Sequence, residues 1–103
     1  MYRYFFAHKD CYSDTWCTKE IEDFIESTKL FLSQDKGAYK GAEFFCDIQL
    51  MLVSNWVSWN SNDYDFEKTN YVSIVVGEVL SDECETFLEE FSKVLRWNFC
   101  EEM

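Results

Sequence analysis

Residues 61–90 carry the clearest strand pattern of the chain, the start of its clearest helix pattern and most of its negative charge. In Tyr71–Val79 apolar residues occupy both faces of a two-residue alternation, which predicts a strand near the centre of a sheet. Ser81 suits the N-cap of a following helix, with Asp82 and Glu83 at the positive end of its dipole. The stretch holds nine carboxylates and one lysine, so we expect this acid to lie on folded structure.

The N-terminal part of the chain predicts a strand, a helix and a loop. Aromatic residues alternate along Tyr2–Lys9, which favours a strand. Thr18 has the side chain of an N-cap residue, and a helix of about fifteen residues is expected after it. The apolar stripe of this helix is Ile21, Phe24, Ile25, Thr28, Phe31 and Leu32. Ser33–Lys40 is expected to be a loop.

Residues 43–53 fit two patterns. As a strand they place Phe44, Cys46, Ile48, Leu50 and Leu52 on one face. As a helix they form a stripe of Phe44, Phe45, Ile48, Met51 and Leu52. The strict alternation of the first set favours the strand. We expect a second short strand at Trp56–Trp59 and a polar, acidic loop at Asn60–Asn70.

The last helix has an apolar stripe and a separate acidic side. The stripe is Cys84, Phe87, Leu88, Phe91, Val94 and Leu95. The residues that fall away from it are Asp82, Glu85, Glu89 and Glu90. Residues 97–103 are expected to fray into an acidic end.

The predicted order of elements is strand, helix, three strands and helix. Two helices with one apolar stripe each can pack on one face of a mainly antiparallel sheet. We therefore expect an α+β fold, a two-layer sandwich with about four strands. Residues 1–103 are expected to form a single domain, because a chain of this length builds one core.

Composition predicts a cytoplasmic protein. Apolar residues make up 48% of the chain and aromatic residues 19%, which is enough for a core without metal or disulfides. No apolar run of signal-peptide length opens the chain, and the longest run, Leu50–Val53, is far below the ~20 residues of a membrane span. The five cysteines show no CxxC spacing, so we expect free thiols at Cys11, Cys17, Cys46, Cys84 and Cys100.

The net charge of −11 bounds the possible partners. Nucleic acid and anionic membranes would repel the chain, whereas basic proteins would be steered toward it. A simpler alternative is that the acid only aids solubility. Residues 61–90 carry a net −8 and residues 1–60 a net −3, and this concentration favours a binding surface.

One cluster resembles a reactive site. His8 with Cys11 or Cys17 could form a nucleophile pair or part of a metal site. One histidine and irregular spacings do not match a zinc pattern, and the chain has no glycine-rich phosphate loop, nucleophile elbow or HExxH motif. We therefore expect no catalytic residue, metal or cofactor, and keep a small thiol enzyme as an alternative.

Acidic and aromatic residues interleave around residue 64. The aromatic members are Trp56, Trp59, Tyr64 and Phe66. Such residues either pack in the core or serve as exposed anchors, with nearby carboxylates giving electrostatic complementarity. The predicted partner-binding residues are Trp59, Asp63, Tyr64, Asp65, Glu67, Asp82, Glu85 and Glu89. Whether residues 63–67 and 82–90 meet in space decides whether they form one surface.

In composition the chain resembles small acidic inhibitors of basic enzymes, a class that includes bacterial toxin-immunity proteins and phage anti-defence proteins. This resemblance assigns no residue. It implies an immunity protein that binds and occludes a basic, nuclease-type toxin. The alternative it implies is a phage-type anti-defence protein that mimics nucleic acid.

Overall fold

A computed structural model of the chain, which describes residues 2–8, 14–52, 64–97 and 99–102, contains eight strands and two helices. In chain order they are β1 (Tyr2–His8), β2 (Trp16–Cys17), α1 (Thr18–Thr28), β3 (Phe31–Asp35), β4 (Ala38–Gly41), β5 (Cys46–Met51), β6 (Lys68–Thr69), β7 (Tyr71–Gly77), α2 (Asp82–Leu95) and β8 (Cys100–Glu102). The strands predicted at Tyr2–Lys9 and Tyr71–Val79 are therefore confirmed as β1 and β7. Residues 43–53 contain the strand β5, as their alternation predicted. The expected strand Trp56–Trp59 lies outside the described residues.

The main sheet has six strands in the order β3-β4-β5-β7-β1-β8, and β2 pairs with β6 in a small second sheet. Every described pairing is antiparallel. β7 lies between β5 and β1, which confirms the central strand predicted from its two apolar faces. The α+β class is thus confirmed, but the main sheet has more strands than the sequence predicted.

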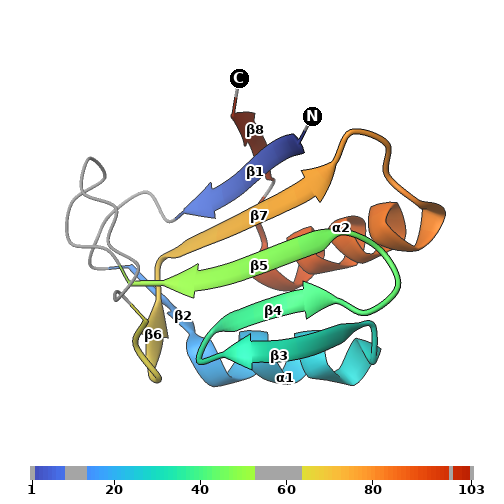
Figure 1. Cartoon of the computed structure of the whole chain (residues 1–103). Coiled ribbons are helices and arrows are strands. Elements are labelled where there is room, and N and C mark those ends of the chain that lie inside the picture. The colour runs from blue at the N-terminus through green and yellow to red at the C-terminus, as the bar shows by residue number, and fades with distance from the viewer. Residues whose placement is uncertain (1, 9–13, 53–63, 98, 103) are drawn as a thin grey trace.

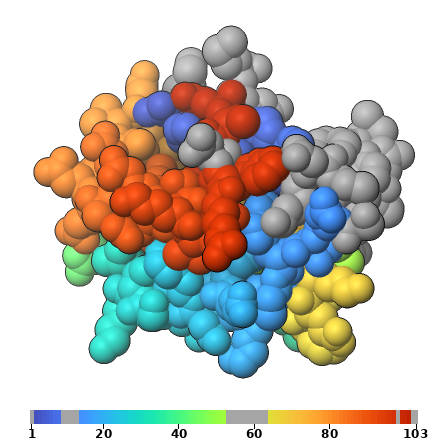
Figure 2. All heavy atoms as spheres, turned by 180° about the vertical axis from the view of Figure 1, so that it is seen from behind, coloured from blue at the N-terminus to red at the C-terminus, as the bar shows by residue number. Residues whose placement is uncertain are grey.

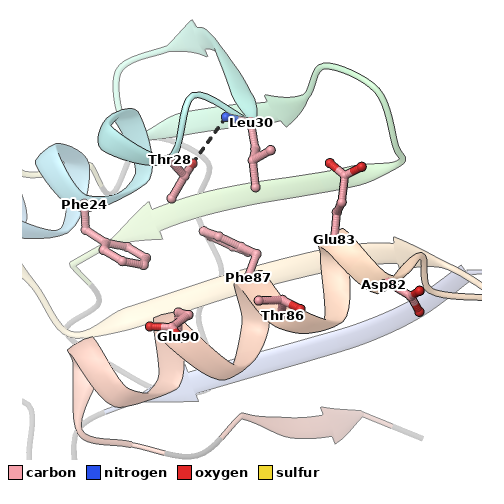
Figure 3. Close-up of a pocket in the computed structure, with 8 residues that line it drawn as sticks. All are labelled: Phe24, Thr28, Leu30, Asp82, Glu83, Thr86, Phe87 and Glu90. Carbon is pink, nitrogen blue, oxygen red and sulfur yellow. Dashed lines mark hydrogen bonds between the residues drawn. The ribbon is translucent and has the colours of Figure 1, made fainter.

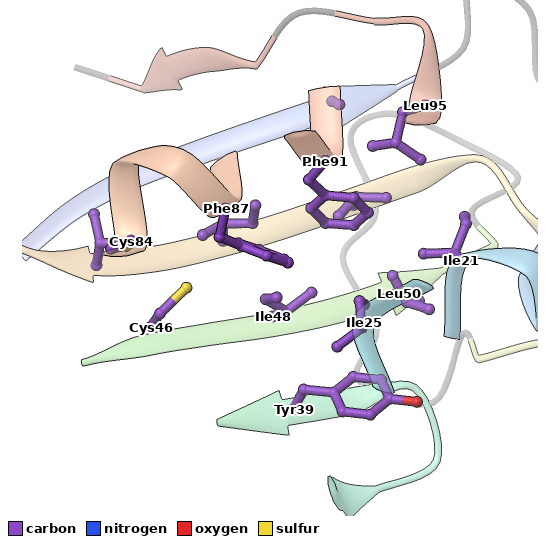
Figure 4. Close-up of a cluster of buried hydrophobic side chains, with 14 residues drawn as sticks. Ile21, Ile25, Tyr39, Cys46, Ile48, Leu50, Cys84, Phe87, Phe91 and Leu95 are labelled. Atoms are coloured by element: carbon purple, nitrogen blue, oxygen red, sulfur yellow. The ribbon is translucent and has the colours of Figure 1, made fainter. Parts of the chain in front are cut away.

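Both helices cover one face of the main sheet (Figures 1 and 2). The core lies between these layers, where alternate residues of β5 and β7 meet the apolar stripes of the helices (Figure 4). Its fully buried members include Ile25, Cys46, Leu50, Val72, Ile74, Val76, Cys84, Phe91 and Leu95. No helix in the described ranges is long and apolar enough to cross a membrane.

β3 and β4 form a hairpin where a helix end and a loop were expected. α1 stops at Thr28 because Lys29 adopts the left-handed conformation, with φ 60°, and its amide donates to the Glu26 carbonyl. Phe31 still packs against the core, but it does so from a strand. A short apolar run fits both periodicities, so the helix was predicted too long.

The C-terminal residues form a strand, and the predicted fraying is wrong for residues 100–102. β8 pairs with β1, with Phe5 opposite Glu101. Arg3 donates from Nε and Nη2 to the two carboxylate oxygens of Glu101, each at 2.9 Å. A three-residue strand has too few residues to show an alternation, so its pairing was not visible in the sequence.

Thr18 is the first residue of α1 and not its N-cap. The cap position is Cys17, whose side chain makes no capping hydrogen bond. The Thr18 hydroxyl instead donates to the Asp65 carbonyl at 2.8 Å and lies 2.7 Å from the Thr69 hydroxyl. Thr18 therefore joins the start of α1 to the segment that precedes β7, a long-range contact that the local pattern does not reveal.

Candidate functional site

α2 carries three of the acidic residues predicted to bind a partner. Ser81 caps the helix as predicted, because its hydroxyl accepts from the Cys84 amide at 3.2 Å. Asp82, Glu85 and Glu89 are all exposed. Spacings of three and four place them on one side of the helix. The structure therefore brings these three predicted residues together.

A groove of about 380 Å³ lies between the end of α1 and the first half of α2 (Figure 3). Its walls are formed largely by apolar side chains and its rim by carboxylates. The apolar members are Phe24, Leu30 and Phe87, and the acidic members are Asp82, Glu83 and Glu90. The groove thus joins an apolar interior to a negative edge.

Packing in the core holds the apolar wall in place. Phe87 is only 2% exposed, and its ring centroid lies 4.6 Å from that of Phe31 and 5.9 Å from that of Phe24. The Leu30 amide donates to the Thr28 hydroxyl at 3.3 Å, which fixes the chain where it leaves α1. A wall built on such contacts is largely formed before any ligand arrives.

The carboxylates of the groove have no cationic partner in the described part of the chain. The two ion pairs found there are Arg3–Glu101 and Lys19–Asp23, and neither belongs to the groove. Lys29 lines a smaller adjoining hollow together with Glu43 and Glu83. The two helices together hold nine carboxylates and two lysines, so this face of the molecule has a negative field.

Tyr64 and Asp65, which were predicted to contact a partner, make contacts within the molecule. The Tyr64 hydroxyl donates to the Glu22 carboxylate at 3.3 Å, and burial raises the pKa of Tyr64. The Asp65 carboxylate accepts from the amides of Glu67 and Lys68 at 2.8 and 2.9 Å, and these bonds lower its pKa. Both residues shape the loop, and their contact with a partner stays a prediction, as does that of the exposed Glu67.

Asp65 and Glu67 lie toward the opposite end of β7 from Asp82, the first residue of α2. Residues 64–67 precede β6 and the Tyr71 end of β7, whereas α2 follows the Gly77 end (Figure 1). A seven-residue strand separates these ends by roughly 20 Å. Asp65 and Glu67 therefore lie apart from Asp82, and neither of them lines the groove. Two predicted members, Trp59 and Asp63, lie outside the described residues.

Seven groove residues were missing from the predicted site: Phe24, Thr28, Leu30, Glu83, Thr86, Phe87 and Glu90. The seven-residue spacing of the two glutamates puts them on one side of a helix, and this signal could have found them. The meeting of that side with α1 depends on how the helices pack, which sequence spacing does not give.

The cluster of His8, Cys11 and Cys17 is described only in part. Cys11 lies outside the described residues, His8 ends β1, and Cys17 is exposed before α1. The described ranges contain no group of three His, Cys, Asp or Glu side chains suited to a metal ion. Cys46 and Cys84 are buried, as their apolar stripes predicted, and a hydrogen bond with Cys84 together with burial raises the pKa of Cys46.

The face of β1 away from the helices is aromatic. Ala7 of β1 is buried in the core, so Tyr2 and Tyr4 point to the opposite face, where they are about half exposed. The Tyr2 and Phe45 rings stack with centroids 4.8 Å apart. The two faces of the molecule therefore differ in character, and the strongly charged one is the helical face.

Comparisons with protein-family models, with curated proteins and with solved structures found no match to this chain.

Proposed function

We propose that this chain is a small acidic inhibitor, an immunity protein that binds and occludes a basic, nuclease-type toxin in the cytoplasm. The observation that carries the proposal is the exposed acidic side of α2 at Asp82, Glu85 and Glu89, beside an apolar groove. Nucleases hold phosphates with lysine and arginine. A negative surface can occupy the same field and exclude the substrate.

The mechanism has two stages with different physical causes. The negative field speeds the encounter, with association rate constants that reach ~10⁸ M⁻¹s⁻¹ or more at low salt. Apolar contacts at the groove then slow dissociation, because most affinity differences between related complexes lie in the dissociation rate. Salt should therefore weaken the encounter more than it weakens the final packing.

The test is affinity capture on the immobilised protein, compared with the Asp82→Asn, Glu85→Gln, Glu89→Gln triple variant. We expect the wild-type chain to retain one basic protein, to release it at high salt and to inhibit its nuclease activity. The triple variant should associate several-fold more slowly. Retention of a non-basic protein, or equal retention by the variant, would contradict the proposal.

The same experiment separates the two alternatives. A nucleic-acid mimic would retain many unrelated basic proteins, because carboxylates in place of phosphates offer little specificity. A thiol enzyme would lose an activity on alkylation of exposed Cys17 while its fold stayed intact.

A further inference from the structure

We infer that the groove between α1 and α2 binds the side chain of a lysine or arginine from the partner. Its methylene stem would lie against Phe24, Leu30 and Phe87, and its cationic head would lie between Glu83 and Glu90. This inference rests on the proposed function and names the chemistry of its anchor residue.

The groove matches both halves of such a side chain. Lysine and arginine bury their aliphatic stems on apolar surface while the charged head stays at the edge. Phe24, which is half-buried, also places an aromatic ring in the wall of the groove, and arginine stacks on such rings more readily than lysine. Figure 3 shows the Phe24 and Phe87 rings turned toward each other, with Glu83 and Glu90 projecting from α2.

The groove has room for one side chain but not for a whole helix. Its volume of about 380 Å³ lies at the lower end of pockets that take small ligands. Glu83 and Glu90 lie two helical turns apart, about 10 Å along the axis. A single cationic head placed between them can approach either carboxylate.

The charges that face the groove all have one sign. α1 contributes Phe24 and Thr28, which are uncharged, and α2 contributes the three carboxylates of Asp82, Glu83 and Glu90. Lys29 lies in the adjoining hollow and does not line the groove. An incoming cation therefore meets no resident cation in the described lining.

The test uses n-hexylguanidinium as the probe, because it has an apolar stem and a cationic head and needs no partner protein. Binding is followed by ¹H–¹⁵N chemical-shift titration of the full chain, with 1-hexanol and guanidinium chloride as separate controls. We expect saturable shifts at Phe24, Leu30 and Phe87. The Glu83→Gln, Glu90→Gln variant should bind more weakly, by about 1.5- to 5-fold for each carboxylate removed.

A matched variant, Asp35→Asn, Asp47→Asn, removes the same charge from exposed positions outside the groove. It should retain binding within about twofold, because these residues are far from the probe and are screened. Equal weakening by both variants, binding of 1-hexanol as tight as that of the probe, or shifts on the open sheet face would each overturn the inference. Failure here leaves the affinity capture unaffected, so the two proposals fail separately.

Discussion

Gly37 and Gly77 differ sharply in their tolerance of a side chain. Gly37 has φ 71°, and an added Cβ would collide with the Tyr64 ring and lie 3.3 Å from the Leu50 carbonyl oxygen. At Gly77 an added Cβ meets nothing within 4 Å. Gly37 is thus required by its backbone conformation and by its close approach to Tyr64, whereas neither requires a glycine at position 77.

Gly37→Ala should lower the free energy of unfolding by about 2–4 kcal/mol, from the left-handed conformation and the collision with Tyr64 together. Gly77→Ala is the control and should be neutral or stabilising by up to about 1 kcal/mol. Urea denaturation measures both. Equal stability of the two variants would show that neither the left-handed conformation of Gly37 nor its contact with Tyr64 restricts this position.

Because the pKa of Asp65 is lowered in the folded protein, its contribution to stability should depend on pH. A carboxyl whose pKa is depressed in the folded state stabilises the fold above its ordinary pKa, near 4, and this contribution disappears as pH falls through the folded value. Asp65→Asn keeps an oxygen acceptor but removes the charge, so the variant should be less stable than wild type at pH 7. The difference in the free energy of unfolding between wild type and Asp65→Asn, measured by urea titrations, should narrow by pH 3. A difference that does not change with pH would show that the charge of Asp65 is not the cause. Glu67→Gln, which removes a neighbouring charge, is the control.

The two helices differ at their N-caps, and this difference is testable. α2 has Ser81 as its cap, whereas α1 has Cys17, whose backbone is extended as a cap requires but whose side chain makes no capping bond. Ser81→Ala should cost about 1 kcal/mol, and Ser81→Asp should restore most of it. Cys17→Ser should stabilise the protein by a similar amount, measured by thermal or urea unfolding. Loss of stability in Cys17→Ser would mean that the thiol packs better than the hydroxyl caps.

Helices and central strands could be predicted from the sequence because their signals are local. The alternation in Tyr71–Gly77 and the cap and stripe of α2 need no knowledge of distant residues. β8 could not be predicted, because it has three residues and pairs with β1 at the other end of the chain. β3 and β4 were missed because they are short, and because Phe31 and Leu32 also continue the helical spacing of α1. The groove could not be predicted either, because it exists only where α1 packs beside α2 and sequence spacing does not give this packing.

In the molecule as a whole, the high net negative charge opposes folding. The chain carries −11, and the described residues show only two ion pairs, so most of the carboxylates gain no compensating contact there. Glu85 and Glu89, four residues apart on α2, add a like-charge pair of the kind that destabilises a helix. Self-repulsion on the helical face thus lowers stability, while the same field favours a cationic partner.

Moderate salt should therefore raise the melting temperature of the free protein. Between about 20 and about 300 mM NaCl the screening length falls below the spacing of neighbouring helical charges on α1 and α2, so repulsion fades while the core is unchanged. We expect a rise of a few degrees by calorimetry or circular dichroism. The Asp82→Asn, Glu85→Gln, Glu89→Gln variant should begin at a higher melting temperature and respond less to salt. A fall in the wild-type melting temperature over this range would mean that internal attractions outweigh repulsion, and the acidic face would then be a paired network with little field to offer a partner.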